Sequence, residues 1–293
     1  MSSNKQGILP AVVTPLTAND EFAPASFERL LERMYTAGCH GVYVCGQTGE
    51  GLLLPVPVRE QAAELAVRCS PGGKTVMIHV GAHRTADAVR LAKHAATVGA
   101  GAISSLPPLG NYGFAEIKEY YRAIASASDL PVFVYYFPEI APAISTADQI
   151  FELCDIPNVA GLKFTDFDLY KLGRIGAAGK TIYNGRDEVL VAGLFMGADG
   201  GIGTFYNLVP DLFVQVYNFA RAGHWEEAKQ VQDRINQLIT IVLRFPLFPA
   251  VKEILKWSGV DCGKCVAPRR SLTADESVAL QAALHESGYD SLL

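Results

Sequence analysis

The sequence predicts an α/β protein in which eight parallel strands close into a (β/α)8 TIM barrel with a C-terminal helical extension. Short apolar runs rich in Val, Ile, Tyr and Phe alternate with longer segments of helical period almost to residue 225. Strands this apolar are typical of parallel sheets that are buried on both faces. Eight such βα units close into a barrel with the helices outside. An open doubly wound sheet is the alternative, although no G-x-G-x-x-G turn follows the first strand.

The expected strands are short and mostly apolar. In chain order they are Ile8–Thr14, Val42–Gly46, Thr75–Val80, Ala102–Leu106, Val132–Phe137, Val159–Phe164, Thr181–Asn184 and Gly201–Thr204. The helices expected between them carry apolar residues at helical spacing, and several begin at Ser, Thr or Asp and end near Gly, as helix caps require. They are Ser26–Ala37, Pro57–Cys69, Ala86–Val98, Phe114–Ser126, Thr146–Cys154, Leu169–Ile175, Glu188–Met196 and Asp211–Ala222.

After residue 223 the pattern predicts helices only, at His224–Leu243, Ala250–Trp257 and Asp275–His285. No linker rich in Pro, Gly or Ser precedes them. We therefore expect a single domain over 1–293, with the barrel in 1–223 and the helices of 224–293 packed on it.

Composition excludes several classes of partner. The 25 basic and 30 acidic residues are well mixed and give a net charge of -5, so the chain offers no basic surface for nucleic acid. Met1 to Gln6 is short and polar, and the apolar stretch Leu238–Phe248 is interrupted by Arg244 and Pro246. Neither segment resembles a signal peptide or a membrane span. We therefore expect a cytoplasmic protein with no membrane partner.

Six irregularly spaced cysteines fit reduced thiols better than a disulfide framework. They are Cys39, Cys45, Cys69, Cys154, Cys262 and Cys265. The last two form a lone C-x-x-C motif without a second pair, which favours structural thiols over a zinc site. His79 and His83 are separated by a strand end and a glycine, so their spacing does not predict a metal site either.

Lys163 is the strongest candidate for chemistry, because active sites of parallel barrels form at the C-terminal ends of the strands. It lies near the end of the otherwise apolar run Val159–Phe164. Lowering a lysine pKa from about 10.4 to about 7 leaves half of the amine neutral, and burial causes such a shift. A neutral amine suits Schiff-base formation with a carbonyl substrate. An ion pair with a carboxylate such as Asp166 or Asp187 is equally compatible with this position.

Two further features could complete such a site. Tyr135 and Tyr136 end the fifth expected strand, so one faces the barrel interior, where it could move protons, although strand tyrosines more often only pack. The glycine-interleaved segment Cys45–Gly51 lets backbone N–H groups and the Thr48 hydroxyl approach an anion. It lacks the lysine of a P-loop, which favours a carboxylate over a nucleoside triphosphate. A plain tight turn is the alternative for this segment.

Several motifs, in this order, resemble the pyruvate-type class I aldolases of the N-acetylneuraminate lyase and dihydrodipicolinate synthase superfamily, over nearly the whole chain. The motifs are Gly46–Glu50 (GQTGE), Val134–Pro138 (VYYFP), Gly161–Thr165 (GLKFT), Tyr183–Glu188 (YNGRDE) and Gly197–Gly203 (GADGGIG). The resemblance implies a (β/α)8 barrel, usually a homotetramer. It also implies that the substrates are a keto acid and an aldehyde, handled through a covalent imine with pyruvate on a lysine, without a metal or an organic cofactor.

The resemblance also implies roles for individual residues. Lys163 would form the imine with the keto carbon of pyruvate, and Tyr135 would be the acid/base near the leaving or attacking oxygen. Thr48, with the backbone around Gln47, would hold the pyruvate carboxylate, although Gln47 replaces a second hydroxyl usual in the family. Positions that hold the hydroxyls of a sugar-acid chain in the lyase branch correspond here to Thr165, Gly185, Asp187, Glu188 and Thr204.

The branch assignment favours a lyase. Ile140 stands where synthases typically carry an arginine for a semialdehyde carboxylate, and 107–112 lacks their adjacent tyrosines. We therefore expect reversible cleavage of a 2-keto-3-deoxy sugar acid, with N-acetylneuraminate as the leading candidate, into pyruvate and an aldehyde. The alternatives are synthase-like condensation of pyruvate with a semialdehyde, a 2-keto-3-deoxy acid dehydratase or aldolase, and a non-catalytic sugar-acid binding barrel. Arg186 is a departure, because it places a cation where an uncharged residue is usual.

Overall fold

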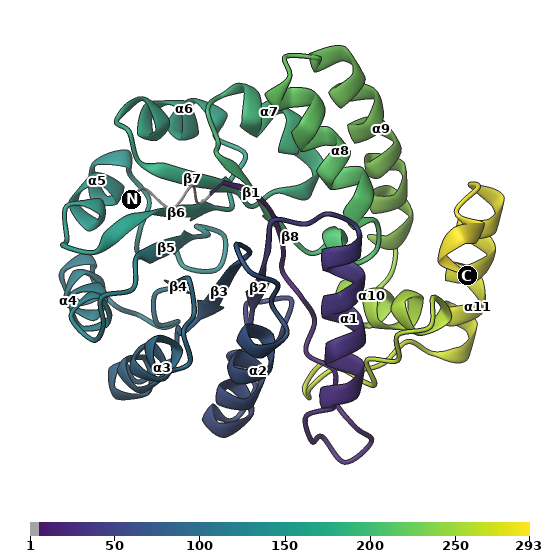
Figure 1. The fold of residues 1–293 in the computed structure, drawn as a ribbon, viewed down its shortest axis with the longest axis horizontal. Coiled ribbons are helices and arrows are strands. Elements are labelled where there is room, and N and C mark those ends of the chain that lie inside the picture. The colour runs from purple at the N-terminus through teal and green to yellow at the C-terminus, as the bar shows by residue number, and fades with distance from the viewer. Residues whose placement is uncertain (1–5) are drawn as a thin grey trace.

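The computed structural model describes residues 6–293 and contains a barrel of eight parallel strands (Figure 1). The strands are β1 (Gly7–Pro10), β2 (Gly41–Val44), β3 (Thr75–His79), β4 (Ala102–Ser105), β5 (Val132–Tyr136), β6 (Val159–Phe164), β7 (Thr181–Asn184) and β8 (Gly200–Gly203). Strands β2 to β8 pair in chain order, and β8 also pairs with β1. The backbone N–H of Val12 donates to Tyr43 O at 3.0 Å and joins the chain beyond β1 to β2. The expected barrel is thereby confirmed, and the open doubly wound alternative is wrong.

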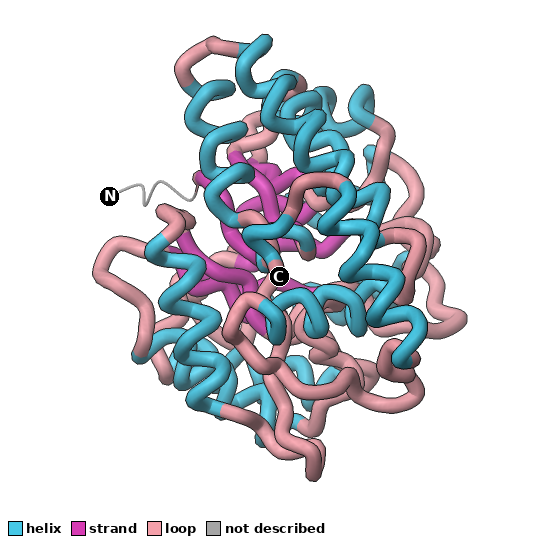
Figure 2. Tube along the Cα trace, turned by 90° about the vertical axis from the view of Figure 1, so that its right-hand side faces the viewer, coloured by secondary structure: helices cyan, strands magenta, loops and turns pink. Residues whose placement is uncertain are grey.

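Helices follow the strands and enclose them (Figure 2). They are α1 (Pro24–Thr36), α2 (Val56–Arg68), α3 (Thr85–Thr97), α4 (Phe114–Ala125), α5 (Ala147–Cys154), α6 (Leu169–Ala177), α7 (Leu190–Phe195), α8 (Pro210–Arg221), α9 (Trp225–Val242), α10 (Leu247–Trp257) and α11 (Ala274–Glu286). Three short 3-10 turns are also present, at η1 (Asp187–Val189), η2 (Phe205–Asn207) and η3 (Asp290–Leu292). The single helix expected at Glu188–Met196 is therefore wrong in detail, because η1 precedes α7.

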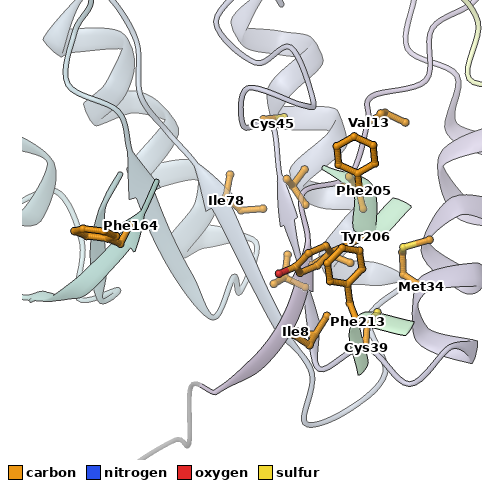
Figure 3. Close-up of a cluster of buried hydrophobic side chains, with 14 of the residues drawn as sticks. Ile8, Val13, Met34, Cys39, Cys45, Ile78, Phe164, Phe205, Tyr206 and Phe213 are labelled. Atoms are coloured by element: carbon orange, nitrogen blue, oxygen red, sulfur yellow. The ribbon is translucent and has the colours of Figure 1, made fainter. Parts of the chain in front are cut away.

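The strands carry two apolar layers, because successive side chains point to opposite faces. Leu9, Tyr43 and Phe133 belong to the cluster inside the barrel. Ile8 and Phe164 belong to the larger cluster between strands and helices, part of which is shown in Figure 3. This double burial explains why the strands read as nearly continuous apolar runs in the sequence.

A buried ion pair connects α10 to the turn that follows β2. Glu50 lies in this turn, and its Oε2 is 2.9 Å from Lys252 Nζ of α10. Arg269 and the backbone N–H of Val266 contact the other carboxylate oxygen, at 3.1 and 2.9 Å. The C-terminal segment is thereby fixed against the barrel. The boundary at residue 223 between the barrel and the C-terminal helices stays a prediction.

None of the helices within residues 6–293 is both long enough and apolar enough to cross a bilayer. The expectation that Met1 to Gln6 is not a signal peptide rests almost entirely on residues 1–5, which lie outside the described residues.

We expect Lys252→Met to lower the free energy of unfolding by about 3 kcal/mol, because it leaves the buried Glu50 carboxylate without its closest cation. Lys256→Met, on the exposed side of the same helix, is the matched control and should change stability by less than about 0.5 kcal/mol. Urea denaturation followed by circular dichroism measures both variants. Equal stability of the two variants would contradict a structural role for this ion pair.

Candidate active site

Lys163 lies inside the barrel near the C-terminal end of β6. In register it is opposite Tyr135 of β5 and Tyr183 of β7. The residue is only 4% exposed, and its Nζ lies 3.9 Å from the centroid of the Tyr135 ring and 4.7 Å from that of Tyr43. Burial lowers the pKa of Lys163 to about 7, and the carboxylate of Asp187 acts in the opposite direction. About half of this amine is therefore neutral at physiological pH.

The two carboxylates that could have neutralised Lys163 have other partners. Asp166 Oδ2 is 3.3 Å from Lys171 Nζ and accepts a hydrogen bond from the Tyr136 hydroxyl at 3.1 Å. Asp187 Oδ2 accepts a hydrogen bond from the backbone N–H of Phe205 at 2.7 Å. Within residues 6–293, Lys163 forms no ion pair with a distance of 4.0 Å or less. The ion-pair interpretation of Lys163 is therefore wrong for both acids.

Asp187 is itself an unusual acid at the end of β7. It is 6% exposed, and burial raises its pKa to about 7, while the hydrogen bond from Phe205 opposes this shift. A Cβ atom at position 203 would lie 1.8 Å from Asp187 Oδ1, so only Gly203 leaves room for the carboxylate. Two titrating groups, Lys163 and Asp187, thus change their charge in the same range near pH 7.

Two amide side chains of α9 hold the η1 turn that carries Asp187. Gln232 Nε2 donates to the carbonyl of Asp187 at 2.9 Å, and Asn236 Nδ2 donates to the carbonyl of Glu188 at 3.0 Å. These side chains bind carbonyl groups that would otherwise accept hydrogen bonds from the backbone N–H groups of the next helical turn. The helix is interrupted there, and η1 is therefore separate from α7. Sequence reasoning missed both amides. Their spacing of four residues on one helix, with Gln232 on the apolar face that carries Ala228, Ile235 and Ile239, is the signal that could have found them.

The two tyrosines that end β5 face opposite sides, as expected. Tyr135 points into the barrel, where its ring lies perpendicular to that of Tyr43 at 6.2 Å. Tyr136 packs on Phe164 in the outer layer, and Lys171 Nζ donates to its hydroxyl at 2.9 Å. Burial raises the pKa of Tyr135 well above its usual value, so the phenol stays protonated at neutral pH. Tyr135 therefore shares the barrel interior with Lys163, and Tyr136 does not.

The turn after β2 brings the Thr48 hydroxyl to the end of β8. Thr48 Oγ1 and Thr204 Oγ1 are 2.7 Å apart. The turn is tight, because a Cβ atom on Gly51 would lie 1.8 Å from the carbonyl oxygen of Cys45. Thr14 fixes the same turn by donating to the carbonyl of Gly49 at 2.7 Å. Two hydroxyls that are far apart in the sequence thus meet at one end of the barrel, whereas Gln47 beside them is partly exposed.

Thr165 and Gly185, which follow β6 and β7, are also in contact. A Cβ atom at position 185 would lie 2.1 Å from Thr165 Oγ1, so glycine permits this approach. Thr165 Oγ1 is buried, and its interaction with the Tyr135 hydroxyl lowers the pKa of that phenol. Glu188 is half-buried in the adjoining turn. The predicted site residues therefore lie at the C-terminal ends of β2, β5, β6, β7 and β8, or in the turns that follow them.

The structure adds two residues that the sequence reasoning did not assign to the site. Tyr43 lies beside Lys163, and its hydroxyl donates to Ser104 Oγ at 3.2 Å. His79 is buried near Tyr135, and its Nε2 accepts a hydrogen bond from the backbone N–H of Leu106 at 3.0 Å. Burial lowers the pKa of His79 well below its usual value, so the imidazole is neutral. His79 ends β3 and Tyr43 is the last residue but one of β2, so their places near the C-terminal ends of strands are the signal that could have suggested them.

The two histidines and the two cysteines considered in the sequence analysis are distinguished by their burial. His83 is exposed whereas His79 is buried. Cys262 and Cys265 are buried in the segment after α10 and are not joined by a disulfide. Burial raises the pKa of Cys262 to about 12 and that of Cys265 to about 11, so both thiols are protonated at neutral pH. These properties fit structural thiols.

Residues 4–287 match the model of the dihydrodipicolinate synthetase family. The chain belongs to this family. It is therefore a lyase of the class I aldolase type, in agreement with the motifs found in the sequence.

Individual relatives in the family cover almost the whole chain. The chain is 35% identical over 283 residues to an N-acetylneuraminate lyase from Rhizobium meliloti, covering 95% of this chain and 94% of the relative. A catalytic lysine mutant of the Ruminococcus gnavus sialic acid aldolase superposes with a TM-score of 0.93 at 26% identity, covering 98% and 97% of the two chains. CdNal from Clostridium difficile, in complex with mannosamine, superposes with a TM-score of 0.92 at 27% identity, covering 97% and 99%.

We expect acetic anhydride to acetylate Lys163 at a rate that rises with pH through an apparent pKa of about 7, because only the neutral amine reacts and the reagent itself does not titrate. Asp187→Asn removes the carboxylate that raises the pKa of Lys163, so the midpoint should move to lower pH. Peptide mapping by mass spectrometry follows the reaction, with the exposed Lys93 of α3 as the internal control. Identical pH profiles at the two lysines would contradict the desolvation of Lys163.

Proposed function

We propose that this class I aldolase cleaves a 2-keto-3-deoxy sugar acid, with N-acetylneuraminate as the leading candidate, into pyruvate and an aldehyde. The observation that carries the proposal is the buried Lys163 amine, which has a pKa of about 7 and lies against the ring of Tyr135. A neutral, desolvated amine of this kind is suited to attack a keto carbon. The R. gnavus relative, whose lysine is described as catalytic, supports this role for Lys163.

The reaction starts when the neutral Lys163 amine adds to the keto carbon and water leaves, which gives a protonated imine. The bond between C3 and C4 of the substrate then breaks, and its electron pair moves into the iminium to form an enamine. The C4 hydroxyl loses its proton and becomes the aldehyde. Protonation of the enamine at C3 and hydrolysis release pyruvate and restore the amine.

Tyr135 is the proton relay in this proposal. Because its pKa lies well above neutral, the phenol accepts the proton of the C4 hydroxyl only as it passes its own proton on. The carboxylate of the bound keto acid is the acceptor. Tyr136 has no part in this step, since its hydroxyl is held by Lys171 and Asp166 in the outer layer.

The residues around Lys163 suit the two ends of such a substrate. Thr48, with the backbone around Gln47, holds the carboxylate next to the imine. Hydroxyls of the sugar-acid chain bind to Thr165, Gly185, Asp187, Glu188 and Thr204. Support comes from the buried Thr165 hydroxyl, which lies beside Tyr135, and from the C. difficile relative, which was solved with mannosamine.

We also propose that the protein is a cytoplasmic homotetramer. Support comes from its family and from Tyr170 of α6 and Phe195 of α7, which are 74% and 68% exposed and would be covered in an assembly. The six cysteines without disulfides fit a reducing compartment.

Treatment with pyruvate and borohydride tests the mechanism. We expect a reduced adduct on Lys163 alone, detected by peptide mass spectrometry. Lys163→Met should abolish both the adduct and cleavage of N-acetylneuraminate, whereas Lys93→Met is the control. Tyr135→Phe should still form the adduct but cleave the substrate at least about 100-fold more slowly, because proton transfer is impaired.

Other outcomes would change the proposal in defined ways. Absence of an adduct in the unmodified protein would remove the imine mechanism. An adduct together with faster dehydration of a shorter 2-keto-3-deoxy acid, or faster condensation of pyruvate with a semialdehyde, would change the substrate. Sugar-acid binding without turnover, unchanged in Lys163→Ala, would indicate a binding barrel.

A further inference from the structure

Arg186 lies directly before the η1 turn, and its side chain reaches across the loops that follow β6 and β5. Its Cζ is 4.4 Å from the ring centroid of Phe167 and 5.2 Å from that of Phe137. Its NH2 group forms an ion pair with Glu139, in the loop after β5. The guanidinium therefore contacts two aromatic rings contributed by two different loops.

The same stack leads back to Lys163. The Phe137 ring is nearly parallel to the ring of Tyr135, with an interplanar angle of 16° and centroids 6.1 Å apart. Tyr135 in turn lies 3.9 Å from the Lys163 amine. Lys163 and Arg186 thus lie over different rings of this pair. A substrate that is bound to Lys163 and extends along the pair would bring a group remote from the keto carbon to Arg186.

Arg186 and Glu139, the two partners of the ion pair, differ in their exposure to solvent. The Arg186 side chain is 15% exposed, and its Nε is buried without a hydrogen-bond partner in residues 6–293. The Glu139 side chain is 59% exposed. An exposed carboxylate loses little when it turns to water, whereas the guanidinium is fixed by its stacking. The arginine is therefore the permanent part of this arrangement, and Glu139 is a carboxylate that another carboxylate can replace.

We propose that Arg186 determines substrate specificity by binding a carboxylate at the end of the substrate that is remote from the keto group. The planar fork of N–H donors on a guanidinium matches a carboxylate, and the fixed orientation lowers the entropy lost on binding. The inference rests on the proposed Schiff-base function, but not on N-acetylneuraminate as the substrate. Among 2-keto-3-deoxy sugar acids the enzyme prefers those with a second, terminal carboxylate, a group that N-acetylneuraminate lacks.

The loop after β5 does not itself contribute the cation that would bind the terminal carboxylate. Ile140, beside Glu139, packs against the apolar cluster of the barrel interior. The positive charge near this loop comes instead from Arg186 after β7. The position of the cation is thus decided by the three-dimensional arrangement of the loops and not by the local sequence after β5.

Two substrates that differ only at the terminal carbon test the proposal. These are 2-keto-3-deoxygluconate, which ends in a CH2OH group, and 2-keto-3-deoxyglucarate, which ends in a carboxylate. The released pyruvate is measured with lactate dehydrogenase. We expect kcat/KM of the unmodified enzyme to be roughly 10- to 100-fold higher for the dicarboxylate, as a charge-assisted contact predicts.

Three variants separate recognition from structure. Arg186→Gln should abolish the preference, mainly by raising KM for the dicarboxylate. Arg174→Gln, at an exposed position of α6, removes the same charge and is the control that should retain the preference. Glu139→Gln removes the competing carboxylate and should increase the preference, a result that does not depend on whether Arg186→Gln folds.

Borohydride trapping with pyruvate is repeated on every variant. A normal adduct with equal kcat/KM for the two substrates would overturn the role of Arg186 and leave the proposed aldolase mechanism intact. Equal losses for both substrates in Arg186→Gln would also overturn it, since they would indicate only a structural bridge to Glu139. Absence of an adduct in the unmodified enzyme would overturn both proposals.

Discussion

The removal of the Lys163 amine from water is the physical constraint on which the candidate site depends. The aromatic rings of Tyr43 and Tyr135 surround the amine, and desolvation brings its pKa to about 7. The pKa of Lys163 stays this low only because the nearby acids have other partners. Lys171 binds Asp166, and a backbone N–H binds Asp187, so neither carboxylate neutralises Lys163 directly. A direct ion pair would stabilise the ammonium and suppress its reactivity.

The C-terminal helices contribute to the site as well as to the stability of the barrel. Lys252 of α10 binds Glu50 and thereby supports the turn that carries Thr48. Gln232 and Asn236 of α9 support the turn that carries Asp187. Two of the loops at the C-terminal end of the barrel are therefore held by helices outside it. Family membership defines the class of reaction, whereas in the proposed function these loops and the side chains they carry select the substrate.

The alternation of strands and helices was readable from the sequence, because periods of 2 and about 3.6 residues are local properties of the chain. Every expected strand is present, and β6 and β7 have the expected bounds. The candidate lysine and the inward-facing tyrosine could also be placed on their strands. The first strand was predicted too long, since regular pairing ends at Pro10. One expected helix was divided, because side chains of α9 bind the carbonyls of η1.

The sequence by itself determined the barrel, the positions of Lys163 and Tyr135, and the presence of an unusual cation at Arg186. Only the tertiary structure decided that Lys163 forms no ion pair within residues 6–293 and that Arg186 lies over the rings of Phe137 and Phe167. The physical reason is that charge state and side-chain contacts depend on groups brought together from distant parts of the chain. Hydrophobic periodicity records which face of an element is buried, but not which neighbours it meets there.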